Sequence, residues 1–371
     1  MLSFAGASRF VISVTLLLVS IPCVAQTQPP SPTPPQPSTS PDTPTVKVGG
    51  TIFADYSVQQ TPKITDADGN EVALSQFEIT RAYINLTGTI SRHVAFRLTT
   101  DVARETGAGS TLNGSYTVRL KFAYGQWNLD DWLGKDAYTR FGVQPTPWIY
   151  YMDDIYRYRF QGQEFEERDG FLTFSDAGAS FHYTFPSNYG DLHTGYYNGD
   201  GYSKFEPNDQ KGFQTRGSVR PFAHASGPLL GLRVNGFYDH DAYVKSAERR
   251  RASSSVTFEH KYVNAAFDFL AARDQTSVNK TAVNAREWSV WATPKTTKGW
   301  EALLRYDHGE PSTAAPDQIR KRTIAGIAYW FSRQPGLWTA IMFDVDNVSV
   351  QNVVPAQPTV RKYAVHTMFN F

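Results

Sequence analysis

The sequence predicts an all-β protein, a closed antiparallel β-barrel that crosses a membrane. Three features predict it: an N-terminal export signal, an alternation of apolar and polar residues from Val46 to the C-terminus, and connections that alternate between long and short. Counting the alternating runs gives about 16 strands, and a count from pattern alone leaves about 14 or 18 as alternatives. The chain then divides into a signal at 1–25, a proline-rich segment at 26–45 and the barrel at 46–371.

The N-terminus has the three parts of a secretory signal peptide. Arg9 precedes an apolar run, Phe10–Val19, and Ala25 ends a short stretch that suits cleavage. The run is about half as long as the ~20 residues that a spanning helix needs. Cys23 could alternatively accept a lipid, although Pro22 departs from the usual lipoprotein pattern. Cleavage after Ala25 would remove the only cysteine of the chain, which excludes disulfide and thiol chemistry in the mature protein.

The composition favours a membrane barrel and argues against a nucleic-acid partner. The formal net charge is +1 at pH 7, so the chain lacks the basic excess that nucleic-acid binding needs. Aromatic residues make up 14% of the chain although the mean hydropathy is −0.40. No stretch after the signal reaches the ~18 apolar residues of a spanning helix. Many aromatic residues with little continuous hydrophobicity indicate strands whose alternate residues face lipid.

The segment 26–45 begins Gln-Thr-Gln-Pro-Pro-Ser-Pro-Thr-Pro-Pro. Proline at this density prevents helix and sheet and favours an extended polyproline conformation. We expect a disordered periplasmic spacer, with a contact to the cell wall as the alternative.

A period of two identifies the strands. In one run Ala82, Ile84, Leu86, Gly88 and Ile90 share a face, and Arg81, Tyr83, Asn85 and Thr87 share the other. The same reasoning places Arg97, Thr99, Asp101, Asn264 and Asp268 inside the barrel, and it places Phe122 and Tyr124 outside, opposite Arg119 and Lys121. Alternation at about 180° per residue indicates a strand with one apolar and one polar face.

The connections alternate between long and short, as an up-and-down barrel requires. Long polar loops are expected near 59–75 and 145–168, and tight turns at Ser91-Arg92 and Lys261-Tyr262. About eight longer loops and about seven shorter turns place both termini on the short-turn side and the longer loops outside the cell.

The C-terminal strand resembles the signal that the outer-membrane assembly machinery reads. Tyr363, Val365, Phe369 and Phe371 fall on one face, and Phe369 and Phe371 form its aromatic end, while His366 stands where that signal usually has glycine. Together with the export signal, this end predicts a location in the bacterial outer membrane. The expected partners are outer-membrane lipid and the barrel assembly machinery.

A barrel of this size leaves a water-filled lumen, and the charges on its wall set its selectivity. The alternation places eight basic residues inside: Arg81, Arg97, Arg119, Lys121, Arg216, Arg220, Arg233 and Arg305. Six acids face them: Asp101, Asp239, Glu259, Asp268, Glu301 and Asp307. The planar donor fork of arginine suits oxyanions, so the pattern favours a row that guides anions. The alternative is a wall of solvated charge pairs, because a slip of one residue reverses the assignment.

The third long loop, 145–168, is rich in aromatic residues and ends in an acidic run. Long loops in compact folds are commonly functional. This loop is expected to fold inward and narrow the pore with Trp148, Tyr151, Asp153, Asp154, Arg157, Glu166 and Glu167. Acids opposite a basic wall would produce a transverse field that orients polar solutes. The alternatives are an outer lid, a contact with a neighbouring protomer, or a sugar path lined by Trp148, Tyr150, Tyr151, Tyr156 and Tyr158.

Catalytic and metal sites are not predicted. The segment Asp66–Glu71 has part of a calcium loop without its full ligand set, so a turn is favoured. The eight histidines have no metal-binding spacing, and Asp239-His240-Asp241 has no recognisable nucleophile beside it. We therefore expect no metal, no cofactor and no enzymatic activity.

Six stretches of strand and turn sequence follow one another after Val46: Arg81–Gly88, Phe96–Asp101, Leu120–Tyr124, Arg140–Pro147, Tyr197–Tyr202 and Asn208–Phe222. Together they resemble the phosphate-selective porin family of the O and P type over most of the chain. The resemblance implies a 16-stranded, usually trimeric porin whose third loop folds inward beside a basic anion path. It also implies that Arg81, Arg97 and Lys121 are wall residues.

From these observations we expect passive diffusion of small hydrophilic solutes, with a modest preference for anions such as phosphate. The expected filter is electrostatic and steric. The alternatives are a general or carbohydrate porin without charge preference, and a structural barrel that is tethered to the cell wall through the proline-rich segment.

Overall fold

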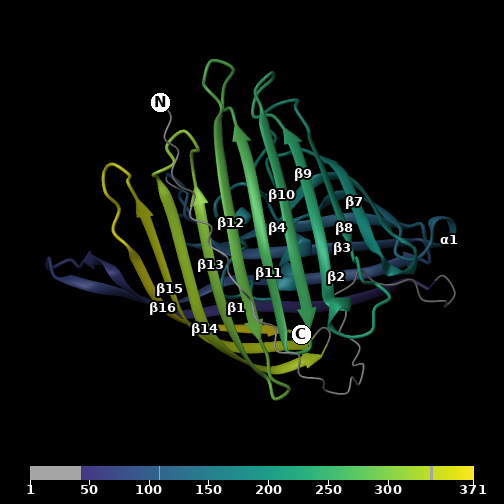
Figure 1. The fold of residues 1–371 in the computed structure, drawn as a ribbon, viewed down its shortest axis with the longest axis horizontal. Coiled ribbons are helices and arrows are strands. Elements are labelled where there is room, and N and C mark those ends of the chain that lie inside the picture. The colour runs from purple at the N-terminus through teal and green to yellow at the C-terminus, as the bar shows by residue number, and fades with distance from the viewer. Residues whose placement is uncertain (1–42, 108, 335–336) are drawn as a thin grey trace, which may run out of the picture.

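The computed structural model is a closed barrel of 16 antiparallel strands, which confirms the predicted fold class (Figure 1). It describes residues 43–107, 109–334 and 337–371. Each strand pairs with its neighbours in the chain, and β1 (Thr45–Thr65) pairs with β16 (Val360–Asn370) to close the barrel. The predicted signal and nearly all of the proline-rich segment lie outside the described residues. No helix in the described part of the chain is long and apolar enough to cross a membrane.

The remaining strands are β2 (Glu71–Ser91), β3 (Val94–Arg104), β4 (Tyr116–Asn128), β5 (Tyr138–Pro145), β6 (Ser175–Thr184), β7 (Gly190–Tyr197), β8 (Gly212–Val219), β9 (Leu232–Asp241), β10 (Arg249–His260), β11 (Val263–Asp274), β12 (Val283–Pro294), β13 (Trp300–Glu310), β14 (Ile319–Gln334) and β15 (Leu337–Gln351). The helices are α1 (Asp130–Leu133), α2 (Ile149–Tyr156) and α3 (Phe165–Arg168), with 3₁₀ turns at Pro186–Asn188 and Pro228–Gly231.

The two faces of the wall differ as the alternation predicts. In β11, Asn264 and Asp268 point inward and are buried, while Phe267 points outward and is exposed. The outer face carries exposed apolar side chains at mid-strand: Val234, Val256, Phe267, Val290, Leu304 and Ile327. An exposed apolar belt of this kind is suited to contact with lipid. The backbone can also lie in lipid, because a closed barrel leaves no strand edge unpaired. The structure therefore supports the predicted outer-membrane location.

The first long connection is shorter than expected, so the predicted loop at 59–75 is wrong. β1 and β2 continue as a hairpin to a tight turn in which the amide of Asp66 donates to the Asn70 carbonyl at 3.0 Å. The Asp66 carboxylate also accepts the backbone N–H of Asn70 at 2.8 Å. Both faces of this extension are exposed, so it carries polar residues that resemble those of a loop.

The predicted outward positions of Phe122 and Tyr124 are also wrong. Thr99 pairs with Phe122 whereas Thr100 pairs with Leu120, which leaves Lys121 as an extra residue in β4. Such a β-bulge reverses the alternation beyond it. Phe122 and Tyr124 consequently point into the barrel and are buried there, while Val118 and Leu120 before the bulge remain outside.

The C-terminal strand closes the barrel through backbone and ionic contacts. Phe371 and Gly50 exchange backbone hydrogen bonds at 2.7 and 2.9 Å. A Cβ atom on Gly50 would lie 2.6 Å from the Phe371 ring, so a larger residue there would have to displace this ring. His366, at the position where glycine was expected, points inward and contacts Asp55 of β1 at 2.9 Å.

Candidate functional site: the lumen and its inward loop

The connection between β5 and β6, residues 146–174, folds into the barrel. It carries α2 and α3. Near its start, the Tyr151 hydroxyl lies 2.8 Å from Ser218 Oγ on β8 and donates to Asn235 on β9 at 3.0 Å. Further along, Asn264 on β11 donates to the Ile155 carbonyl at 3.1 Å. The loop therefore runs across the interior and not over the outer rim.

Ion pairs and hydrogen bonds hold the rest of the loop against the opposite wall. Arg157 and the Tyr158 hydroxyl both donate to Glu301 on β13 at 3.0 Å. Gln161 donates to Asp344 on β15 at 2.8 Å. Two further pairs, Arg305 with Glu164 and Arg168 with Asp307, add contacts of 3.2 and 2.8 Å. These bonds satisfy buried groups on both elements, which makes the position of the loop specific.

Aromatic packing fills the space between the loop and this wall. Tyr156, Tyr158 and Phe160 pack against Trp291 and Trp330, with Tyr158 and Trp330 edge to face at 5.8 Å. Each buried aromatic side chain contributes roughly 1.5–3 kcal/mol relative to an exposed one, and edge-to-face pairs add about 0.5–1.5 kcal/mol. This half of the lumen is therefore closed, and the open space lies on the other side of the loop.

Two residues that were expected to form the constriction are instead buried, which corrects the prediction for them. Trp148 is 0% exposed, packs on Phe237, and donates its indole N–H to Glu166 at 2.8 Å. Glu166 is also buried. Burial, and then the nearby Asp268, raises the pKa of Glu166 to about 8. Neither residue faces the pore, because both are held between the loop and the wall.

Three of the expected pore-lining basic residues, Lys121, Arg216 and Arg305, are enclosed as well. Arg305 points inward as expected but lies under the loop, between Glu164 and Asp307, so it fastens the loop and does not line the passage. Lys121 donates to the Tyr83 hydroxyl at 3.0 Å and sits 4.0 Å above the Phe174 ring. It borders the open space but is 3% exposed.

The open side of the loop presents Tyr150, Tyr151, Asp153, Asp154 and Arg157. The predicted acids are not equivalent there. Glu167 accepts both ends of the Arg159 fork at 2.7 and 3.0 Å, and Asp153 lies 3.6 Å from the same guanidinium.

Asp154 is exposed to the lumen, and its carboxylate has no ion pair or hydrogen bond within the described residues. Enclosure by the barrel, and then the neighbouring Glu259 and Asp153 carboxylates, raises the pKa of Asp154 to about 7. Asp154 is thus the free negative charge on the open face of the loop.

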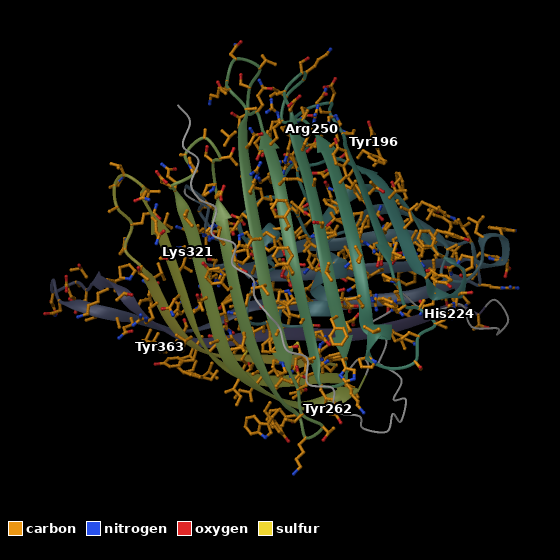
Figure 2. The ribbon with its side chains drawn as sticks, viewed as in Figure 1. Tyr196, His224, Arg250, Tyr262, Lys321 and Tyr363 are labelled. Carbon is orange, nitrogen blue, oxygen red and sulfur yellow. The ribbon has the colours of Figure 1, made fainter. Side chains whose placement is uncertain are left out.

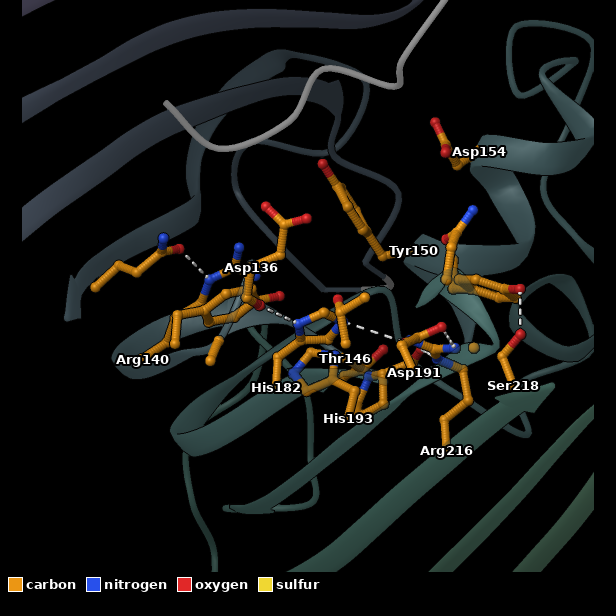
Figure 3. A pocket seen from close by; sticks show the side chains of 18 of the residues that line it. Asp136, Arg140, Thr146, Tyr150, Asp154, His182, Asp191, His193, Arg216 and Ser218 are labelled. Atoms are coloured by element: carbon orange, nitrogen blue, oxygen red, sulfur yellow. Dashed lines mark hydrogen bonds and ion pairs between the residues drawn. The ribbon is translucent and has the colours of Figure 1, made fainter. Parts of the chain in front are cut away.

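One cavity of ≈ 370 Å³ lies below the loop, toward the short-turn end of the barrel. Figure 3 shows Tyr150 and Asp154 on one side of it and a row of basic and histidine side chains on the other. In that row Arg216 pairs with Asp191, which also contacts His182, and Arg233 pairs with Glu259 at 2.8 Å. Arg220 also lines the cavity, and its side chain has no partner among the described residues.

A second cavity of ≈ 190 Å³ lies beside β1 to β4 and shares Tyr150 and Asp154 with the first. On its wall side Arg97 donates to Thr99 and Asn85 at 3.1 and 3.2 Å and lies 4.4 Å over the Phe122 ring. These partners are neutral, so no paired carboxylate offsets the positive charge of Arg97, which lies opposite the acids of the loop.

Two further basic residues of the wall are paired with one carboxylate. Arg81 and Arg119 share the Asp101 carboxylate at 3.0 and 3.1 Å, and the Tyr202 hydroxyl donates to it at 3.0 Å. This group lies on the half of the wall nearest the long loops, and two arginines there share one carboxylate.

Arg140 is a lumen residue that the sequence analysis missed. It borders the first cavity with only 3% of its surface exposed, donates to Gln126 at 2.8 Å, and lies between the rings of Tyr124 and Tyr138 at 4.8 and 4.2 Å. No carboxylate pairs with it within the described chain. It pairs with Gln126 in the register of β4 and β5, on the face that the bulge at Lys121 turns inward.

Comparisons with known proteins show the fold and no family. No family model matches the sequence, and no curated protein matches it. Among solved structures, an anion-selective porin from Comamonas acidovorans is similar, with a TM-score of 0.60 and 12% identity over 89% of this chain and 100% of that one.

Two other solved structures are similar to the same degree in fold. The trimer form of OmpT, an outer membrane protein of Vibrio cholerae, has a TM-score of 0.56 and 13% identity over 89% of this chain and 100% of that one. The outer membrane channel DcaP of Acinetobacter baumannii has a TM-score of 0.55 and 11% identity over 88% and 97%. The chain therefore has the fold of outer-membrane porins. Its resemblance to the phosphate-selective type stays a prediction.

Proposed function

We propose that this protein is a porin that passes small hydrophilic solutes by diffusion, with a modest preference for anions. One observation supports the preference. Three lumen arginines, Arg97, Arg140 and Arg220, have no carboxylate partner in the described chain, and the residues that line the two cavities include eight basic and five acidic side chains. A solute on this path therefore meets an excess of positive charge.

The expected strength of the anion preference follows from the surroundings and the spacing of the arginines. A unit charge at 4 Å contributes about 1 kcal/mol in water and more beside a protein wall, and physiological salt screens it over about 8 Å. The arginines are spread over two cavities, so each would bind an anion weakly. Weak binding at successive sites allows entry and release, which diffusion through a pore requires. This dispersion supports a general anion preference more than a dedicated phosphate site.

The mechanism needs no chemical step. The inward loop would restrict the size of solutes, and the guanidinium forks would offer paired donors to carboxylates, sulfates and phosphates. Asp154 faces these forks from the loop, so the field across the open side points from wall to loop. A dipolar solute would turn its negative end toward the wall as it passes.

The test is the reversal potential of the purified channel in a planar bilayer under a salt gradient. We expect the sign of anion preference for the native protein. The variant with Arg97→Gln, Arg140→Gln and Arg220→Gln is expected to shift toward cations. Arg361→Gln is the matched control, because Arg361 is exposed on the outer face of β16. Cation preference in the native channel, or no shift in the triple variant, would contradict the proposal.

A carbohydrate path has less support in this geometry. Of the five loop aromatics that could line it, Trp148, Tyr156 and Tyr158 are buried against the wall, and only Tyr150 and Tyr151 face the open space. Two rings would stack on a sugar without forming a continuous track. Swelling of liposomes that contain the protein, measured with neutral sugars and with sugar acids of the same size, separates the two functions.

The remaining expectations belong to the same proposal. We propose that residues 1–25 are cleaved, that Phe369 and Phe371 present the assembly signal, and that the barrel forms a homotrimer. Both phenylalanines are exposed at the short-turn end of the barrel, where an assembly factor could reach them. The solved trimer form of a similar barrel supports the oligomer. Mass spectrometry of the native protein extracted from membranes tests both the N-terminus and the number of subunits.

A further inference from the structure

A shallow groove of ≈ 270 Å³ lies on the outer wall of the barrel, at the loop end of β9 to β12. Arg250, Arg273 and Arg286 line it together with Tyr238. Ala252 and Ala271 form its floor, because their short side chains leave room between the arginines. The lumen does not contain this groove, so the proposed pore leaves these three charges unexplained.

The strand alternation shows that the arginines point away from the lumen. Arg250 and Arg273 are exposed, whereas their neighbours Arg251 and Ala272 are buried inside. Arg250 and Arg273 stand directly opposite each other in the register of β10 and β11. Figure 2 shows Arg250 at the loop end of these strands and Tyr262 at the opposite end.

The position of the groove along the membrane normal places it where the outer leaflet meets the external water. Arg273 is ten residues beyond Val263, which begins β11 beside the short turn. At about 3.3 Å per residue and a tilt of about 40°, this separation corresponds to about 25 Å along the membrane normal. An apolar barrel belt is about 25 Å tall. The arginines therefore lie where the acyl chains of the outer leaflet end and its headgroups begin.

The local charge balance is positive. The Glu248 carboxylate accepts from both Arg250, at 3.1 Å, and Arg273, and it holds the two guanidinium groups together. The side chain of Arg286 has no ion pair or hydrogen bond within the described residues, although Glu310 lies opposite it in the register. Two carboxylates thus face three arginines, and Lys321 extends the outward basic row on β14.

Aromatic side chains form a layer directly below. Trp288 stacks on His308 with centroids 5.3 Å apart and contacts Tyr306 and Phe267 at 5.4 and 6.3 Å. Aromatic rings in this position mark the headgroup level of a membrane. Exposed arginines just above them would face an anionic headgroup at close range, where the guanidinium fork matches a phosphate.

We infer that this groove binds the phosphorylated headgroup of a lipid in the outer leaflet. The three arginines supply the contacts to phosphate, and the alanine floor with the aromatic layer below accommodates the start of the acyl chains. A free phosphate ion would gain nothing from the apolar part of the site, so a lipid is the ligand. This site is independent of the lumen and of the proposed solute.

The experiment titrates the full-length folded protein in detergent with bisphosphorylated lipid A, and with phosphatidylethanolamine as a lipid of low negative charge. The test variant carries Arg250→Gln, Arg273→Gln and Arg286→Gln. We expect about 100-fold weaker binding of lipid A to the variant, because each basic residue contributes roughly a factor of five at a membrane surface. Arg361→Gln, an outer-face arginine on another part of the rim, is expected to bind as the native protein does.

Four results would overturn the inference. They are equal binding of lipid A by the variant, equal binding of phosphatidylethanolamine by the native protein, displacement of lipid A by an equal concentration of inorganic phosphate, and a change in subunit number without a change in lipid binding. The last result would assign the groove to a contact between protomers. Heat-modifiable gel migration and unchanged single-channel conductance show that the variant is folded.

Discussion

The side chain of Arg157, at the end of α2, donates to Glu301 on β13 at 3.0 Å and so joins the inward loop to the wall opposite its origin. Glu301 is fully buried and also accepts from the Tyr158 hydroxyl. A short loop segment thereby meets a carboxylate nearly 150 residues later in the chain, at a separation of 144 positions. The position of the loop depends on such contacts, because nothing covalent holds it inside the barrel.

Removing this carboxylate should loosen the loop. Glu301→Ala leaves the Arg157 charge and the Tyr158 hydroxyl without their partner. Breaking a buried pair costs about 3–5 kcal/mol, and the partial exposure of Arg157 places the expected loss near the lower end. We expect noisier and larger single-channel currents and a lower unfolding temperature. Glu301→Gln retains an acceptor and should have a smaller effect; equal currents in both variants and the native channel would show that the loop is held without this contact.

Replacing Asp101 should change the charge of the half of the wall nearest the long loops. This buried carboxylate holds Arg81 and Arg119. Asp101→Asn adds one net positive charge to the lumen wall, so we expect a stronger anion preference by up to about fivefold, the factor for about 1 kcal/mol. Salt-gradient reversal potentials measure it. Glu78→Gln, which removes the partner of Arg104 near the rim, is the control. A shift toward cations in Asp101→Asn would contradict the assigned field.

The selectivity should depend on pH through Asp154. Its pKa is raised to about 7, so the carboxyl is mostly neutral below this pH and mostly charged above it. Acidification therefore removes the negative charge of the loop, and the anion preference should rise as the pH falls through 7. Reversal potentials at about pH 5.5 and pH 8.5 test this direction.

The variant Asp154→Asn tests whether Asp154 is responsible for this effect. Its anion preference at high pH should match that of the native channel at low pH. A pH response of the same size in the variant and the native protein would show that Asp154 is not the titrating group.

The fold could be predicted because a barrel repeats one simple pattern, and β11 shows it without interruption. Lys121 shows where the pattern fails: one extra residue in β4 reverses the later side chains of that strand, and no residue type marks a bulge. The hairpin extension of β1 and β2 was predicted as a loop since both of its faces are exposed.

The orientation of the inward loop could have been predicted in part. Ile149, Met152, Ile155 and Tyr156 recur at helical spacing and are all buried, while Tyr150, Asp153, Asp154 and Arg157 face the other way. A period of 3.6 separates these sets in the sequence. Which wall the apolar set meets depends on contacts with distant strands, as for Trp148 on Phe237, and a local pattern does not contain that information.

His366 should stabilise the closure of the barrel. Its two ring nitrogens lie 2.9 Å from Asp55 on β1 and 3.3 Å from Asp344 on β15, so one buried side chain joins three strands. His366→Ala leaves two buried carboxylates close to each other without a cation between them. We expect the variant to unfold at a lower temperature in the gel-shift assay, with a loss of about 3–5 kcal/mol.

The double change Asp55→Asn and Asp344→Asn in the His366→Ala background should restore much of that stability. The penalty in the single variant arises from unpaired buried charge, and two neutral amides remove this charge. The backbone pairing of β1 with β16 would remain as in the native protein, because its hydrogen bonds do not involve these side chains. If His366→Ala melts as the native protein does, or if the amide pair lowers stability further, the closure depends on backbone pairing and the terminal phenylalanine instead.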